Sequence, residues 1–190
     1  MVPRWISALV ALIILLYAHD LHYATYWNLL AILIYLCLPP EIANEICLTQ
    51  FVFAQTWALA IGISVIIGMN STIMDDACQQ YGCGFAWIGN IIIHYLAPIT
   101  ITIRIYSLPF NQHLIHPPRL IVGWTCTLVT GVLYGVYMDP VSRYKLEICQ
   151  HTFLAWLLLS AAVALVALKY AVVPLMASSQ QVPGSSLPNR

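Results

Sequence analysis

Residues 85–106, FAWIGNIIIHYLAPITITIRIY, form an apolar run in which Arg104 is the only charged side chain. A run of this length meets the requirement of about 20 residues for an α-helix that crosses the hydrocarbon core of a bilayer. Further apolar runs cover residues 5–18, 25–38, 51–69, 120–137 and 152–175. The first two are short for a perpendicular span, so we expect them to tilt or to lie partly in the interface. The pattern predicts an all-α integral membrane protein with about five to six membrane helices.

The composition supports a membrane protein and argues against several soluble classes. Of the 190 residues, 61% are hydrophobic and 7% are charged, against about 25% charged residues in a soluble domain. Seven Lys or Arg residues balance seven Asp or Glu residues, so no basic surface is available to hold nucleic acid. The sequence has no GxxxxGK[ST] phosphate loop, and no metal-ligand spacing surrounds its cysteines. We therefore expect the lipid bilayer as a partner, and no nucleic acid, metal or cofactor.

The polar segments divide the chain into a membrane domain, residues 1–176, and a polar C-terminal tail, residues 177–190. Within the domain, we expect residues 1–40 to form N-terminal anchor helices; residues 45–176, which form the rest of it, are a channel region only by the resemblance given below. The Ser, Gln, Pro and Gly residues of the tail are typical of a loose chain end. The run at residues 5–18 is expected to remain as a first membrane helix, because no small-x-small cleavage site follows it cleanly.

Basic residues and two cysteines bear on the orientation in the membrane. If all six runs span it, Arg4, Arg104, Arg119, Lys169 and Arg190 fall on the N-terminal side, and Arg143 and Lys145 on the other. This bias fits a positive side at the N-terminus. Cys78 and Cys83 lie in a polar stretch and would pair if it faces an oxidising space. Two unpaired thiols are the alternative.

Arg104 is costly at its depth in the membrane. An Arg at the centre of a membrane helix costs at least about 2.5–3.5 kcal/mol on insertion scales. Such a residue is retained as an anchor whose guanidinium reaches back to the interface, or because a charge is needed within the bilayer. The apolar run ends close to Arg104, which favours the anchor when this residue is considered alone.

Polar and titratable side chains gather at three further places. Asn90 and His94 lie one helical turn apart; Asn111, Gln112, His113 and His116 follow Arg104; and Glu147, Gln150 and His151 have the i, i+3, i+4 spacing of one helix face. Histidine titrates near neutral pH, which suits a proton relay. Each group has a simpler interpretation: a hydrated helix end for the last two, and a hydrogen-bonded structural histidine for His94.

The neighbours of Arg104 resemble those of an arginine in a known family. Pro98 stands six residues before Arg104, and His113 stands nine residues after it. Downstream come Leu146-Glu147 and then Ala155-Trp156, and upstream comes Leu48-Thr49-Gln50-Phe51. Over about residues 45–176, this order and spacing resemble subunit a, the proton-channel stator subunit of mitochondrial F-type ATP synthases. The chain departs from that family at three positions, where it has Asn90, Leu108 and Leu154.

The resemblance implies a non-catalytic subunit that translocates protons in the mitochondrial inner membrane. Arg104 would face the carboxylate of a rotating c-ring and separate two half-channels, because a guanidinium cannot pass on a proton. Glu147, His151, Gln150, His113, His116, Asn111, Asn90 and His94 would line the proton path. Two long, tilted helices, about residues 86–116 and 141–176, would form a hairpin against the ring. The implied partners are the c-ring proteolipid and other membrane and peripheral-stalk subunits of the synthase.

A second resemblance points to catalysis. Thr25 at the start of the second apolar run and the pattern Asn90-x-x-x-His94 are similar to residues of the androgen-induced, FAR-17a-like membrane hydrolases, which have six helices. This resemblance implies a threonine hydroxyl activated by a histidine base for the cleavage of a lipid ester. A third possibility is a structural membrane subunit of a respiratory or transport complex, in which Arg104 is only an anchor.

Overall fold

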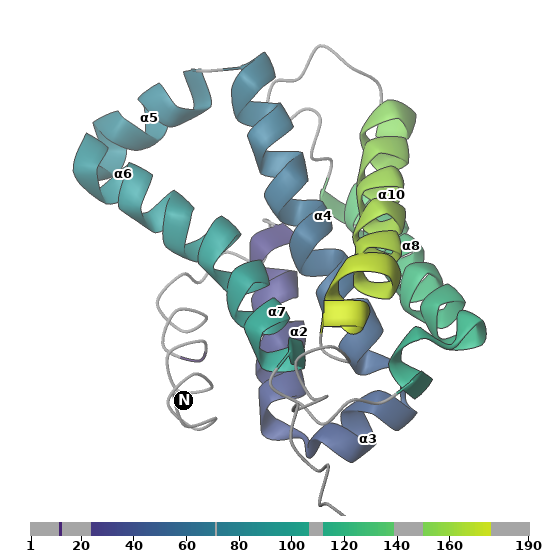
Figure 1. Cartoon of the computed structure of the whole chain (residues 1–190). Helices are drawn as coiled ribbons and strands as arrows, with labels where there is room; N and C mark the ends of the chain where they lie inside the picture. Colours follow the sequence, from purple (N-terminus) through teal and green to yellow (C-terminus); the bar gives the residue numbers. More distant parts are fainter. Residues whose placement is uncertain (1–11, 13–23, 71, 107–111, 139–149, 176–190) are drawn as a thin grey trace, which may run out of the picture.

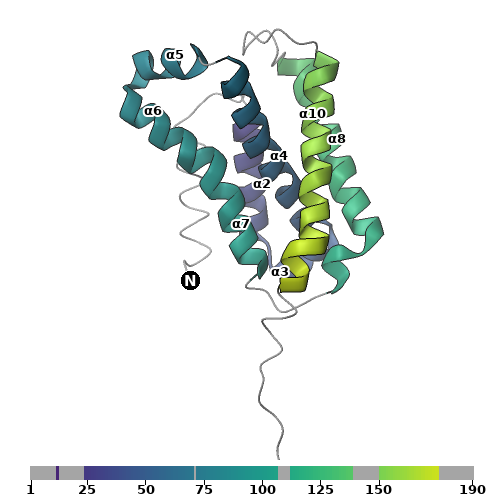
Figure 2. The same ribbon diagram turned by 45° about the horizontal axis from the view of Figure 1, so that its top comes forward.

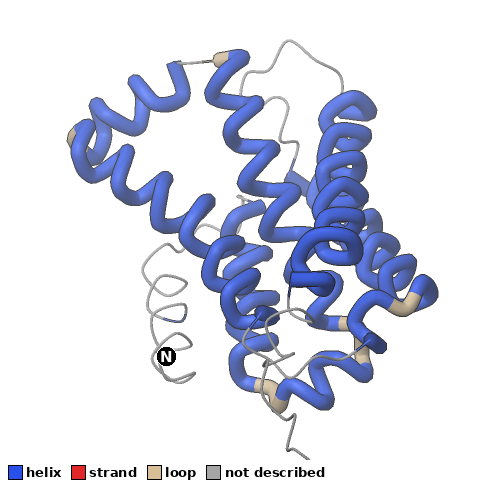
Figure 3. Tube along the Cα trace, in the orientation of Figure 1, coloured by secondary structure: helices blue, strands red, loops and turns tan. Residues whose placement is uncertain are grey.

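The computed structural model describes residue 12 and residues 24–70, 72–106, 112–138 and 150–175. Within these residues every regular element is a helix, and none is a strand (Figures 1 and 3). Four helices are long and apolar enough to cross a membrane, namely Leu48–Met69, Cys83–Tyr106, Pro117–Tyr137 and His151–Leu175. Trp27–Cys37 is a shorter apolar helix. The all-α, multi-pass class is therefore confirmed. Apart from Leu12, the first apolar run lies outside the described residues, as does the C-terminal tail.

The helices follow one another with short connections. In chain order they are α2 (Ala24–Cys37), α3 (Pro40–Glu45), α4 (Leu48–Met69), α5 (Thr72–Tyr81), α6 (Cys83–Asn90), the π-helix η1 (Ile91–Leu96), α7 (Ala97–Tyr106), the 3-10 helix η2 (Gln112–Ile115), α8 (Pro117–Met138), α10 (Gln150–Ala167) and the π-helix η3 (Leu168–Val172). Pro40 opens α3 and Pro117 opens α8, positions at which the missing N–H of proline costs no helical hydrogen bond.

Helix α4 is the central element of the bundle. It packs against α2, α7, α8 and α10 (Figure 2), and Val52, Ala54 and Ala58 on it are fully buried. It also buries four polar side chains: Thr49, Gln50, Gln55 and Thr56. Small residues and hydrogen-bonding side chains are typical of helix contacts inside a membrane, where apolar burial alone does not drive association. The polar side of α4 therefore belongs to the interior of the bundle.

One face of α8 carries small residues at intervals of one helical turn. Gly123, Thr127 and Gly131 are buried there. A Cβ atom on Gly123 would lie 2.7 Å from Cβ of Gln50, and a Cβ atom on Gly131 would lie 2.8 Å from a methyl carbon of Leu157. Only glycine allows α8 to approach α4 and α10 this closely, as in other membrane helix pairs with small residues four apart.

Three of the side-chain hydrogen bonds that join helices distant in sequence involve Trp57, Trp124 and Gln50. Trp57 Nε1 of α4 donates to Thr102 Oγ1 of α7 at 3.1 Å. Trp124 Nε1 of α8 donates to the carbonyl oxygen of Leu158 in α10 at 3.2 Å. Gln50 Nε2, which is fully buried, donates to the carbonyl oxygen of Leu114 at 3.1 Å. These bonds join α7 and η2 to α4, and α8 to α10.

The helix expected over residues 86–116 is shorter in the structure. Helix α7 ends at Tyr106, and residues 112–115 form a separate 3-10 turn. Helix α8 then starts at Pro117 and is a membrane-length helix of its own, which packs on α4 and α10. Proline at 117 and 118 begins a helix readily but cannot continue one. The hairpin of residues 86–116 and 141–176 stays a prediction; both α7 and α10 contact α4.

The two ends of the bundle differ in chemistry. At one end, Cys78 and Cys83 form a disulfide beside Asp75 and Asp76 (upper left in Figure 1). At the other end, α7 finishes and α8 starts. Among the described residues, all Lys and Arg side chains belong to this second end, namely Arg104, Arg119 and Lys169. A disulfide needs an oxidising compartment, and basic residues prefer the cytoplasmic side of a membrane, so both features give the same orientation.

Candidate functional site

His94 lies in the middle of the Cys83–Tyr106 span, on the π-helix η1. Pro98 explains this local widening, because a proline leaves the carbonyl four residues earlier, that of His94, without its helical partner. Single π-helical turns inside α-helices occur frequently at functional sites. The imidazole is half-buried. Next to it in sequence, the Tyr95 hydroxyl forms a 2.7 Å hydrogen bond with Ser64 Oγ of α4, which holds η1 against the central helix.

Arg104 contacts an aromatic side chain of the same chain. Its Cζ atom lies 5.3 Å from the ring centroid of Tyr35 on α2, within the range of a cation–π interaction. Tyr35 is 1% exposed, and Ile101 and Ile105 on either side of Arg104 are buried. The Nε atom of Arg104 is buried and has no hydrogen-bond partner among the described residues. The guanidinium therefore packs between α2 and α7, as an anchor at the end of a span would.

The contact between Tyr35 and Arg104 sets the relative height of two helices. Both α2 and the α6–η1–α7 helix run from the disulfide end of the bundle toward the basic end (Figure 1). Thr25 precedes Tyr35 by ten residues, and His94 precedes Arg104 by ten residues. With a rise of 1.5 Å per residue, Thr25 and His94 each lie about 15 Å from that contact along their helices. The two residues therefore stand at equal distances along their helices from the contact between Tyr35 and Arg104; the side chain of Thr25 lies outside what the structure describes.

The polar residues after Arg104 lie at the basic end. His116 is exposed, and its carbonyl oxygen accepts the N–H groups of Arg119 at 2.9 Å and Leu120 at 3.2 Å. It thus helps to start α8. His113 is in the 3-10 turn η2, but its side chain is outside the described part, and Asn111 lies outside it altogether. Only the backbone carbonyl of His116 takes part in these bonds, so the expected roles of all three side chains stay predictions.

The residues before and within α10 lie at the opposite end. Gln150 is the first residue of α10, and its side chain is not described. His151 is exposed. Glu147 falls outside the described residues. The expected face formed by these three residues stays a prediction. Asn90 ends α6, half-buried, one turn before His94 and on the same continuous helix.

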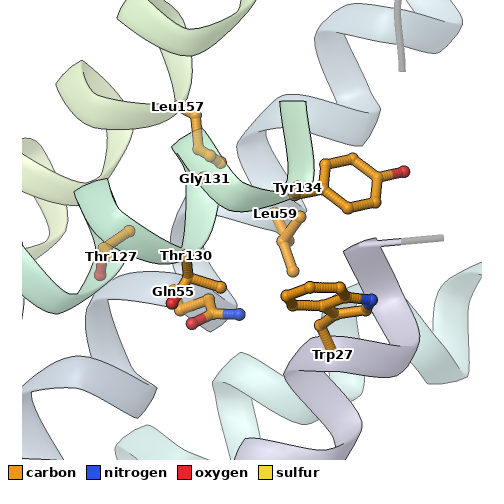
Figure 4. A pocket seen from close by; sticks show the side chains of 8 residues that line it. All are labelled: Trp27, Gln55, Leu59, Thr127, Thr130, Gly131, Tyr134 and Leu157. Atoms are coloured by element: carbon orange, nitrogen blue, oxygen red, sulfur yellow. The ribbon is translucent and has the colours of Figure 1, made fainter. Parts of the chain in front are cut away.

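A small cavity lies where α2, α4, α8 and α10 meet (Figure 4). Its volume is about 20 Å³, and it is lined by Trp27, Gln55, Leu59, Thr127, Thr130, Gly131, Tyr134 and Leu157. Trp27 and Tyr134 stack edge to face at its side, with ring centroids 6.2 Å apart. Gln55 is 5% exposed, and its Oε1 atom has no hydrogen-bond partner in the part of the chain that the structure describes. Gln55 and Thr127 are not among the site residues predicted from the sequence. Each is a polar side chain inside an apolar run, and this feature could have drawn attention to them.

Comparison of the chain with protein-family models, with curated proteins and with solved structures finds no match. In the described residues, no group of three or more His, Cys, Asp or Glu side chains is placed to hold a metal ion. The features that bear on function are His94 in the middle of an apolar span, Thr25 on the neighbouring apolar helix α2, and Arg104 packed on Tyr35.

Proposed function

We propose that the protein is an intramembrane hydrolase that cleaves a lipid ester, with Thr25 as nucleophile and His94 as general base. The observation that supports the proposal is that Thr25 and His94 each stand ten residues before one partner of the contact between Tyr35 and Arg104, on helices that run in the same direction. A histidine in the middle of an apolar span is costly, and such residues generally have a function. A hydroxyl and an imidazole are the pair that acyl transfer requires.

The reaction follows from the chemistry of the pair. His94 removes the proton from the Thr25 hydroxyl as its oxygen attacks the ester carbonyl, and the protonated imidazole then gives that proton to the departing alcohol. A water molecule, deprotonated by the same imidazole, hydrolyses the acyl-threonine and regenerates the hydroxyl. A substrate dissolved in the bilayer reaches this level laterally.

Arg104 has a positioning role in this proposal. The cation–π contact joins α2 to α7, and Trp57 ties α7 to α4 through Thr102. Together these contacts hold two separate helices in a fixed register. A short shift of α2 along α7 would change the height of Thr25 relative to His94, since each residue adds about 1.5 Å.

Covalent labelling tests this proposal directly. A fluorophosphonate probe reacts with activated hydroxyl nucleophiles, so we expect it to label the purified protein at Thr25 and to abolish ester hydrolysis. Mass spectrometry of the labelled peptide identifies the modified residue. The His94→Ala variant should not be labelled, because its hydroxyl is no longer activated. Labelling at another residue, or ester hydrolysis that survives complete labelling of Thr25, would overturn the assignment.

A second candidate, favoured by one feature of Arg104, is proton translocation as the stator subunit of a mitochondrial rotary ATP synthase. Its guanidinium lies in a membrane span, and its buried Nε atom has no partner among the described residues. A carboxylate on a neighbouring c-ring would pair with the remaining N–H groups of the guanidinium, and the positive charge would hold that carboxylate ionised. The polar residues near His116 and His151 lie at opposite ends of the bundle, as two half-channels would require.

Native electrophoresis of gently solubilised membranes tests this second function. If it holds, the chain migrates in a megadalton-scale band with ATP hydrolysis activity and a two-helix proteolipid. Arg104→Ala should then abolish proton-driven ATP synthesis while the complex stays assembled, because no other group replaces the fixed charge. Arg104→Lys is the matched variant that retains a cation. A small band without ATPase subunits excludes the stator role and leaves the hydrolase.

A further inference from the structure

Helices α8 and α10 leave an apolar groove between them at the basic end of the bundle. The groove has a volume of about 250 Å³ and is lined by Leu120, Ile121, Trp124, Ala162, Leu165, Val166 and Lys169. Ile121 is 62% exposed and Val166 is 56% exposed, so the groove opens outward from the bundle. On a membrane span an outward face meets lipid, and an open apolar groove there is filled by a hydrocarbon chain.

Lys169 is the only charged residue that lines the groove. Its Nζ atom lies 5.0 Å from the ring centroid of Tyr170, which is 68% exposed. Tyrosine side chains of this kind favour the level of the lipid headgroups, and a lysine stem extends along apolar surface to bring its ammonium group there. No carboxylate pairs with Lys169 among the described residues. The groove thus joins an apolar slot to one cation that no carboxylate of the described residues neutralises.

Neighbouring charges agree with an anionic ligand. The Arg119 guanidinium, one residue before the groove, donates to the carbonyl oxygen of Asn44, so it stays at this end of the bundle. Glu41 and Glu45 are exposed on α3, at the same end but not in the groove lining. The disulfide lies at the far end, which places the basic end on the side where the leaflet carries negative lipids.

From these observations we infer that the groove between α8 and α10 binds an anionic phospholipid of the bilayer. One acyl chain lies along Ile121, Ala162 and Val166, and the headgroup phosphate pairs with the ammonium group of Lys169. The lipid would fill the groove on the outer side of the contact between Trp124 and Leu158 and so stabilise the packing of α8 on α10. This site does not depend on either proposed function, because none of the residues proposed for them lines it.

Lipid titration of the purified, delipidated protein tests the site. Native mass spectrometry should show phosphatidylglycerol binding about fivefold more tightly than phosphatidylcholine with the same acyl chains, as expected for one basic group near the surface. Lys169→Gln should remove this preference and leave the two lipids equal. Ala162→Phe, which fills the groove, should weaken both lipids about tenfold or more, because methylene contacts are lost.

Ala167→Phe is the matched control for the filled groove. Ala167 is exposed on α10 and does not line the groove, so this variant should bind both lipids as the wild-type protein does. Equal affinities of the wild-type protein for the two lipids, or a preference that survives Lys169→Gln, would disprove the headgroup contact. Unchanged binding in Ala162→Phe would disprove the groove. If Ala162→Phe does not fold, Lys169→Gln decides the headgroup contact and Ile121→Trp, on an exposed side chain, decides the groove.

Discussion

A Gly123→Val variant is expected to unfold far more readily than the wild-type protein, because α8 packs tightly on α4 at this residue. The new Cβ atom would lie 2.7 Å from Cβ of Gln50 and 3.0 Å from its carbonyl carbon. The second of these is backbone, which cannot rotate away as a side chain does. Overpacking of a well-packed interior costs about 1–3 kcal/mol and sometimes more. Thermal unfolding in detergent, followed by tryptophan fluorescence and by recovery of monodisperse protein, measures this loss.

Gly135→Val on the same helix is the control for that experiment. A Cβ atom on Gly135 would meet nothing within 4 Å, so this variant has the same change in helix propensity without the clash. We expect its melting temperature to stay close to that of the wild-type protein. Equal melting temperatures for the two variants would mean that α8 does not pack on α4 as the structure shows. The comparison therefore tests the central contact of the bundle independently of function.

The membrane spans could be predicted from the sequence because each one is a continuous apolar run bounded by polar residues. The run at 51–69 corresponds to α4, which begins at Leu48, and the run at 120–137 corresponds to α8. The start of α8 was missed by a few residues because Pro117 and Pro118 suggest a break. Proline tolerates the first turn of a helix, so the break and the new helix coincide.

The contacts of the candidate site could not be predicted, since hydrophobicity gives the length of a helix but not its rotation or its neighbours. Arg104 was recognised as costly, yet nothing in the sequence indicates that Tyr35 covers it. The buried side of α4 could not be predicted from its apolar run either. In the sequence, Gln50 and Gln55 look like polar residues that interrupt or end the span, although both are buried in the bundle. In a membrane, such side chains turn toward other helices, where backbone carbonyls or cavities receive them.

The pairing of Thr25 with His94 shows the same limit. In the sequence the two residues belong to different apolar runs, with the run at 51–69 between them, and their relative height is undefined. The observed contact between Tyr35 and Arg104 gives their two helices a common reference point. The sequence contained the equal spacing of ten residues on each helix, but that spacing has no meaning until the helices are known to run in the same direction (Figure 1).

The variant His94→Ala is expected to lower kcat/KM for ester hydrolysis by about 10²–10⁴, the usual contribution of a general base. Thr25→Ala should reduce turnover to the background rate, and Thr25→Ser should keep measurable activity because it retains the hydroxyl. The measurement is release of fatty acid from fluorogenic esters by protein in detergent micelles, with melting temperatures taken in parallel. His151→Ala and His116→Ala are the controls, since both side chains are exposed and lie toward the two ends of the bundle, away from mid-membrane. A His94→Ala protein with full activity, or a loss of activity in either control equal to that in His94→Ala, would contradict the proposed base.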